Sequence, residues 1–282
     1  MKTLITLYIP ILLFLLVSCQ DVIDVELQSG PERLVVEASL DWEKGIAGNR
    51  QTIRLTKSSA YFTTNSVEEV QGAIVTVTNT DTGDSFNYVD QNNGNYVTTN
   101  FQPIIGNSYA LRIEYGGQVY SATETMTSVA EIRDIFQTRD DGFSDTDLEV
   151  HVIFTDPEEE GNNYLFKFQK QGHLLPLFEN AEDEFVNGNE IDWWFEIEED
   201  EVDGLEPFQP GDVVSIEMYG ISRAYYDYIK ILIDQMDGAG LFSSTPVPVR
   251  GNCINETNPE DYAYGYFRLT EVNRATYTFT ED

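Results

Sequence analysis

The chain has 282 residues, of which 41% are hydrophobic and 12% are aromatic. This composition excludes a disordered chain and provides enough apolar side chains for a substantial core. Acidic residues number 49 and basic residues 16, so the formal net charge is −33. Nucleic acid and anionic membrane surfaces are excluded as partners, because their negative charge would repel the protein.

The N-terminus has the organisation of an export signal. Residues 1–3 carry one positive charge, and residues 4–16 form an apolar run that is too short to span a bilayer comfortably. The run ends in Leu16-Val17-Ser18-Cys19, which resembles the bacterial lipobox. We therefore expect residues 1–18 to be a lipoprotein signal peptide and Cys19 to carry a covalent lipid. The alternative is an ordinary signal peptide whose removal leaves a free cysteine near the new N-terminus.

Cysteine use and hydropathy limit how the mature chain is held together and attached. Cys253 is the second of two cysteines, and it has no partner for a disulfide if Cys19 is lipidated. No apolar run after residue 16 approaches the length of a transmembrane helix. The lipid is therefore the only membrane attachment that the sequence predicts.

The first part of the mature chain is predicted to be a tether followed by a β domain. Residues 19–32 form an acidic tether that contains Ser29-Gly30-Pro31. Residues 33–126 alternate apolar and polar side chains with a period of two, and Asn, Asp and Gly fill the breaks between the alternating runs. Seven short strands in about 90 residues predict an immunoglobulin-like β-sandwich.

After Met126 the spacing between strands loosens and the loops become acidic, which predicts a second, β-rich domain over residues 127–282. We expect one amphipathic helix in it, over residues 222–237. Ser222 can cap the first turn, and apolar side chains from Tyr225 to Met236 recur at helical spacing. The predicted fold class is therefore mainly β, with a sandwich followed by a β-rich domain that carries one helix.

Catalytic motifs are absent from the sequence. His151 and His173 stand 22 positions apart in unlike surroundings, which does not support a zinc site. His151 falls on the polar side of its strand, where a solvated or hydrogen-bonded histidine is expected. The chain has no Gly-x-Ser-x-Gly elbow, no Walker loop and no dinucleotide fingerprint. We therefore expect no catalytic residues and a protein that is not an enzyme.

Two acidic segments, residues 140–147 and 196–203, have the composition of calcium-binding loops. Neither has the spacing of the twelve-residue calcium loop, so we expect solvated acidic loops with no metal. Apart from the lipid on Cys19, no cofactor is predicted.

Trp194 is the best candidate for contact with a partner or ligand. The alternation that sends Trp193 inward sends Trp194 outward, between Asp192 and Glu196. An exposed tryptophan beside acidic groups is typical of a sugar-stacking or partner-anchoring site. The alternative is that another strand or loop covers the ring.

Motifs in both halves of the mature chain resemble those of the Bacteroidota lipoproteins known as domain-of-unknown-function family 4249. They are the lipobox with Val22-Ile23-Asp24-Val25, Leu34-Val35-Val36-Glu37-Ala38, Gln71-Gly72-Ala73-Ile74-Val75-Thr76-Val77, residues 109–115, the helix over residues 225–236, Val249-Arg250-Gly251-Asn252 and Gly265-Tyr266-Phe267. The resemblance implies an outer-membrane lipoprotein, often encoded beside a TonB-dependent receptor. It implies no known reaction and carries over no catalytic residue.

The sequence therefore predicts a lipid-anchored binding or accessory protein of the outer membrane, which works with a TonB-dependent transporter in nutrient capture. The acidic residues Asp21, Asp24 and Glu26 resemble a surface-export signal and favour the cell surface over the periplasmic face. The alternative function is that of a structural or adhesive cell-envelope protein with no transport role.

Overall fold

The computed structural model describes residues 30–59, 67–144, 146–182, 187–200, 204–236 and 247–281. The signal peptide, Cys19 and most of the tether lie outside the described residues. One compact unit comprises Glu32–Ser59 and Thr63–Asp282. Within the described ranges, no helix combines the length and the apolar character needed to cross a membrane.

The first half of this unit is an immunoglobulin-like sandwich, as the alternation predicts. Its strands are β1 (Leu34–Glu43), β2 (Gln51–Lys57), β3 (Ile74–Asn79), β4 (Ser85–Asp90), β5 (Asn95–Thr98), β6 (Ser108–Tyr115) and β7 (Gln118–Thr125). Neighbouring strands pair in the order β1-β2-β5-β4-β3-β6-β7, and the short β14 (Ile254–Asn255) extends this order beyond β7. The alternate side chains that face inward form one buried cluster, which includes Val36, Ile53, Val77 and Ile113.

The second half has two sheets that enclose a second core. One sheet pairs β8 (Ile132–Thr138), β9 (Glu149–Thr155) and β12 (Glu190–Phe195), with β9 in the centre. The other orders β11 (Leu177–Glu182), β10 (Asn163–Lys170), β13 (Val213–Ile221) and β15 (Tyr264–Thr278). Apolar side chains from both sheets, among them Val150, Val152, Phe166 and Ile216, are fully buried between them.

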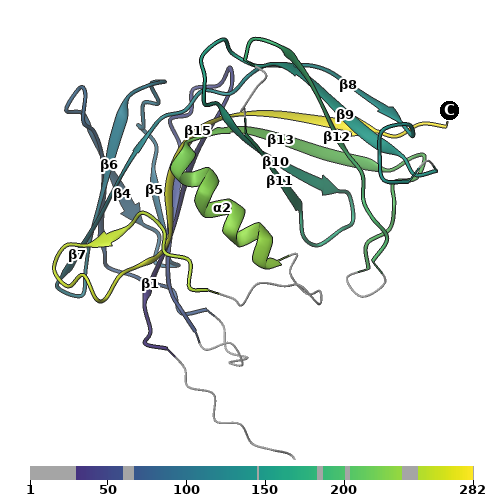
Figure 1. Ribbon diagram of the computed structural model, residues 1–282. Helices are drawn as coiled ribbons and strands as arrows, with labels where there is room; N and C mark the ends of the chain where they lie inside the picture. The colour runs from purple at the N-terminus through teal and green to yellow at the C-terminus, as the bar shows by residue number, and fades with distance from the viewer. Residues whose placement is uncertain are drawn as a thin grey trace, which may run out of the picture. The chain divides into compact units, whose positions relative to one another are not determined.

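The predicted amphipathic helix is α2 (Arg223–Met236), which covers the other face of the β11-β10-β13-β15 sheet (Figure 1). The Ser222 hydroxyl oxygen accepts a hydrogen bond from the Tyr225 amide at 3.2 Å, so Ser222 caps the first turn as its position predicts. Tyr225 and Tyr226 are buried against the sheet. Met236, which the apolar stripe places inward, is instead 67% exposed at the end of the helix.

Strand β15 connects the two halves. Its first part pairs in parallel with β1, from Val35 opposite Tyr264 to Glu43 opposite Val272, and its last part pairs with β13 (Figure 1). Gly265 adopts a φ of 89°, and a Cβ at this position would collide with the Val36 carbonyl, so the parallel pairing requires glycine here. The side chains of Phe267 and Leu269 in β15 belong to the first core, and Phe279, just after β15, belongs to the second core. The predicted division of the chain between residues 126 and 127 stays a prediction.

A buried ion pair lies where these elements meet. The Arg268 guanidinium of β15 donates a 2.6 Å hydrogen bond to the Asp41 carboxylate of β1, and it lies over the rings of Tyr219 and Tyr225. Arg268 is 5% exposed. The pair therefore joins β1, β15, β13 and α2 through one side chain.

Replacing Phe267 with alanine should lower the free energy of unfolding by about 3–5 kcal/mol, because the ring is fully buried in the first core. Urea denaturation of wild type and variant measures this loss. Val89→Ala is the matched control, since Val89 is 64% exposed and its truncation should cost little. A loss for Phe267→Ala that is no larger than that of the control would contradict the placement of β15 in the core.

Candidate functional site

The two adjacent tryptophans of β12 point to opposite faces of their sheet. Trp193 points into the second core, stacks on Phe166 with ring centroids 5.2 Å apart, and donates a 2.7 Å hydrogen bond to the Glu179 carboxylate. Trp194 points away from this core and is half-buried. Its ring and the Phe143 ring pack edge to face, with their centroids 5.4 Å apart. A loop residue therefore covers part of the ring that the sequence places outside.

Side chains on this outer face stand in rows across β8, β9 and β12, because directly paired residues of antiparallel strands share a face. Phe136, His151 and Trp194 form one such row. The rings of Phe136 and His151 stack with centroids 4.6 Å apart. Thr138 and Glu149 form the next row. The loop after β8 folds back over these rows, since the amides of Asp140 and Asp141 contact Glu149 and the Phe143 ring contacts Trp194.

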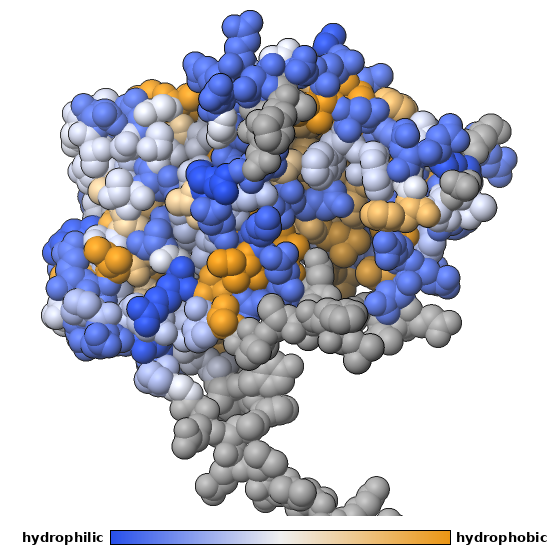
Figure 2. All heavy atoms as spheres, viewed as in Figure 1, coloured by the Kyte–Doolittle hydropathy of each residue, from blue (hydrophilic) through white to orange (hydrophobic). Residues whose placement is uncertain are grey.

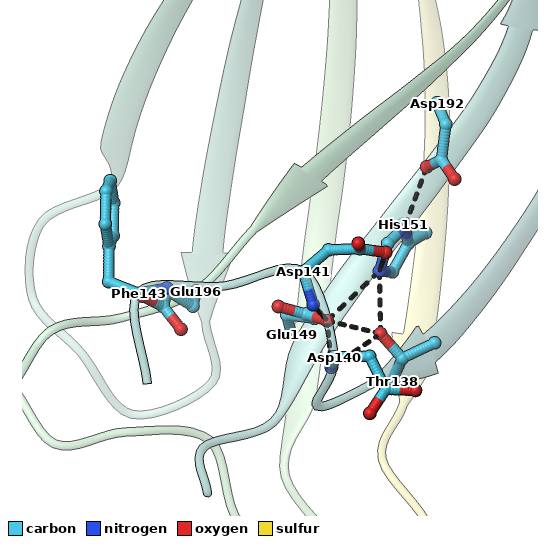
Figure 3. A network of polar contacts seen from close by, with 8 residues as sticks. All are labelled: Thr138, Asp140, Asp141, Phe143, Glu149, His151, Asp192 and Glu196. Carbon is cyan, nitrogen blue, oxygen red and sulfur yellow. Dashed lines mark hydrogen bonds and ion pairs between the residues drawn. The ribbon is translucent and has the colours of Figure 1, made fainter. Parts of the chain in front are cut away.

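The His151 imidazole is buried in a network of polar contacts (Figure 3). Its Nδ1 lies 2.7 Å from the Asp192 carboxylate. Its Nε2 lies 2.9 Å from the Thr138 hydroxyl and 3.4 Å from Glu149 Oε1. Asp141 Oδ2 lies 4.0 Å from the same nitrogen. The hydrogen-bonded histidine predicted on the polar side of the strand is thus present, but it is enclosed instead of solvated.

Glu149 has no exposed surface, and its Oε1 is heavily hydrogen-bonded. The amides of Asp140 and Asp141 donate to it at 2.9 and 2.8 Å, and the Thr138 hydroxyl donates at shorter range. Burial alone would raise the pKa of this carboxyl, but the hydrogen bonds from Thr138, the two amides and His151 outweigh it, and the pKa lies below its ordinary value. The carboxylate is therefore charged at neutral pH.

Three of these residues could hold a metal ion. The ligand atoms of Asp141, Glu149 and His151 all lie within 4.8 Å of one another. Two of the three side chains are buried, and the Asp141 side chain is 61% exposed. The combination of carboxylate oxygen and imidazole nitrogen is a donor set that divalent ions accept.

A groove opens beside this network. It has a volume of about 870 Å³ and is lined by Phe143, residues 172–179, residues 194–200, Gly204, Leu205, Ile233 and Met236. On the face seen in Figure 2, apolar side chains gather in a hollow beside α2. Leu174 and Leu175 are 92% and 69% exposed at the groove. Apolar side chains thus form its wall, while Glu198, Glu199 and Asp200 supply negative charge.

The structure places the residues singled out by the sequence as follows. Trp194 lies in the wall of the groove, and Cys19 lies outside the described residues. The two acidic segments are brought together, since the Phe143 amide of the first donates to Glu196 Oε1 of the second at 2.7 Å. Sequence reasoning missed Glu149 as a site residue. Its only signal was its position two residues before His151 on one face of β9.

The sequence matches the family model described as Domain of unknown function (DUF4249) over residues 20–276. The chain belongs to this family. The match covers the groove, the polar network and every strand up to the last residues of β15. Membership of the DUF4249 family assigns no reaction or ligand to these residues. No curated protein matches the sequence.

Several solved structures are similar to parts of this DUF4249 chain. A two-domain fibronectin type-III segment of chicken tenascin is 12% identical, with 61% of this chain and 84% of that chain covered and a TM-score of 0.22. A cytokine receptor complex is 10% identical, with coverages of 68% and 86% and a TM-score of 0.27. A DUF4785 family protein from Legionella pneumophila is 10% identical, with coverages of 66% and 52% and a TM-score of 0.25. These scores are too low to say more about this protein.

Glu179 should make the stability of the protein depend on pH. Burial raises the pKa of its carboxyl from 4.5 to about 7, and the hydrogen bond from Trp193 only partly opposes this. The folded protein thus binds the proton more tightly than the unfolded chain, so the stability from this group is complete below pH 4.5 and is lost as the pH rises through 7. Glu179→Gln should therefore flatten the fall in the free energy of unfolding across this range.

Urea denaturation at several pH values between these limits tests the expectation for wild type and variant. Glu198→Gln is the control, because Glu198 is an exposed acid of the same groove. If Glu179→Gln and wild type lost stability with the same slope, Glu179 would not be the group responsible.

Proposed function

We propose that the protein is a lipid-anchored binding or accessory protein of the outer membrane, which works with a TonB-dependent transporter in nutrient capture. The groove beside Trp194 carries this proposal. Its volume of about 870 Å³ falls within the range of pockets that take small molecules, roughly 300–1,000 Å³. A mainly apolar wall with a few polar groups is also what such pockets offer.

The lining of the groove suggests the chemistry of its ligand. Glu198, Glu199 and Asp200 contribute acidic groups, and none of the described lining residues is lysine or arginine. Trp194 and Phe143 offer aromatic surface for stacking. We propose a ligand with an apolar or ring-shaped body and a positive charge, because the acids and the net charge of −33 would repel an anion.

The anchor and the partner come from the N-terminus and the family resemblance. Leu16-Val17-Ser18-Cys19 supports a lipid on Cys19 as the only membrane attachment. The resemblance to outer-membrane lipoproteins supports a TonB-dependent receptor as the partner and the cell surface as the location, with the periplasmic face as the alternative. We propose binding in place of catalysis, since the chain carries no catalytic motif.

A structural or adhesive envelope protein is the second candidate function. Leu174 and Leu175 favour it, because two adjacent leucines that are 92% and 69% exposed are suited to bury against another protein. Neighbouring genes separate the two proposals. A transporter gene beside this one favours nutrient capture, and a cluster of adhesion genes favours the structural role.

Replacing Cys19 with alanine should release the protein from the membrane fraction, because the lipid is its only predicted attachment. Each buried methylene of an acyl chain contributes about 0.8 kcal/mol to membrane binding, so loss of all chains leaves no stable anchor. Fractionation of cells after a salt wash measures the effect. A variant that stays in the membrane fraction would show that Cys19 is not the anchor.

Replacing Trp194 with alanine should weaken capture of the partner or ligand by about 2 kcal/mol or more, since a half-buried tryptophan in a groove is typical of a binding hot spot. Affinity purification from detergent-solubilised membranes, followed by mass spectrometry, compares the variant with wild type. Trp194→Phe is the matched variant and should retain part of the binding. Equal capture by Trp194→Ala and wild type, at equal melting temperature, would remove Trp194 from the proposed site.

A further inference from the structure

Two carboxylate oxygens of the polar network are buried without a hydrogen-bond partner. They are Oε2 of Glu149 and Oε2 of Glu196, and neither contacts a donor among the described residues. Glu149 has no exposed surface and Glu196 is 9% exposed. An unpaired carboxylate oxygen in the interior is costly unless a proton or a cation neutralises it.

Gly142 shows that both oxygens face the same space. A Cβ built on this glycine would lie within 2.5 Å of Glu196 Oε2 and of Glu149 Oε2. The two oxygens therefore lie within about 5 Å of each other, a separation that one ion with oxygen ligands at about 2.4 Å can bridge. Only a residue without a side chain leaves this space open.

The surroundings of the two carboxylates supply little positive charge. Within the described residues, no lysine or arginine forms an ion pair with Glu149 or Glu196. His151 is the basic group that contacts Glu149, and it also lies beside the acidic Asp141 and Asp192. Buried acids therefore outnumber the available bases on this face of the sheet, which favours a bound cation.

We propose that Glu149 and Glu196 bind a divalent metal ion in the space beside Gly142, with Asp141 and His151, whose ligand atoms lie within 4.8 Å of that of Glu149, as further donors. The spacing of Glu149 and Glu196 in the sequence matches no recognised metal-binding motif. Glu149 and His151 lie on β9, Asp141 on the loop that follows β8, and Glu196 directly after β12. The pairing of these three strands brings the donors together.

The donor set indicates the class of metal. Asp192 holds Nδ1 of His151 at 2.7 Å, which orients Nε2 toward Glu149 in the way that carboxylates orient metal-binding histidines. Imidazole combined with carboxylates suits first-row ions such as Mn²⁺ and Zn²⁺, whereas Ca²⁺ and Mg²⁺ take oxygen ligands almost exclusively. We therefore assign the site to a transition-metal ion.

Titration of the metal-free protein tests the proposal. The full chain, purified in detergent and treated with EDTA, is titrated with MnCl₂, ZnCl₂, CaCl₂ or MgCl₂, and calorimetry and melting temperature are recorded. We expect one equivalent of Mn²⁺ or Zn²⁺ to bind and to raise Tm by roughly 5–10 °C at one hundred times the Kd. Failure of all four ions to bind, or tighter binding of Ca²⁺ than of Mn²⁺ and Zn²⁺, would overturn the assignment.

Four variants locate the ion. Glu149→Gln, Glu196→Gln and His151→Gln each remove a donor and should weaken Mn²⁺ or Zn²⁺ binding about tenfold or more. Gly142→Ala keeps every donor but places a methyl group between the two free oxygens, and it should weaken binding by a similar factor. Gly142 does not have a positive φ, so alanine is compatible with its backbone.

Glu198→Gln is the matched control, since it removes an exposed acid from the same segment and should bind metal as wild type does. Circular dichroism confirms that each variant is folded before its titration is interpreted. Wild-type affinity in both Glu196→Gln and Gly142→Ala would overturn the proposal, because the ion would then lie elsewhere. The groove can bind its ligand whether or not this site exists, so the two proposals fail independently.

Discussion

The pairing of β15 with both β1 and β13 is the constraint on which the rest of the structure depends. One continuous strand supplies hydrogen bonds to the first strand of the sandwich and to a central strand of the second half. Its side chains enter both cores, and Arg268 joins it to Asp41 through a buried ion pair. With β13 held in this way, the second core forms between its sheet and the β8-β9-β12 sheet. The outer face of β9 then carries the polar network.

The network and the groove share two residues, Phe143 and Glu196. The Phe143 amide donates to Glu196 beside the proposed metal site, and the Phe143 ring meets Trp194 in the wall of the groove. The proposed cation at Glu149 and Glu196 would therefore lie beside the loop that carries this ring. Both proposals concern acidic groups, since we propose a cationic ligand in the groove and a metal ion at the buried carboxylates.

Local patterns predicted much of this fold. Alternation over residues 33–126 predicted the sandwich, and the inward side chains of its strands form one buried cluster. Ser222 and the spacing of apolar side chains identified α2. The parallel pairing of β1 with β15 could not be predicted, because it joins residues more than 200 positions apart and no local pattern specifies such a partner. The burial of Glu149 and His151 was hidden for a similar reason. Alternation places them on the polar face of β9, which the Phe136 ring and the loop after β8 then cover.

The proposed metal site centres on Glu149 and Glu196, beside Gly142. Anomalous diffraction from crystals grown with Mn²⁺ tests this most directly, because it locates the ion without relying on a variant. We expect an anomalous peak at about 2.0–2.3 Å from oxygens of both Glu149 and Glu196, beside Gly142. An empty space there, with the two carboxyl groups close enough to share a proton, would contradict it.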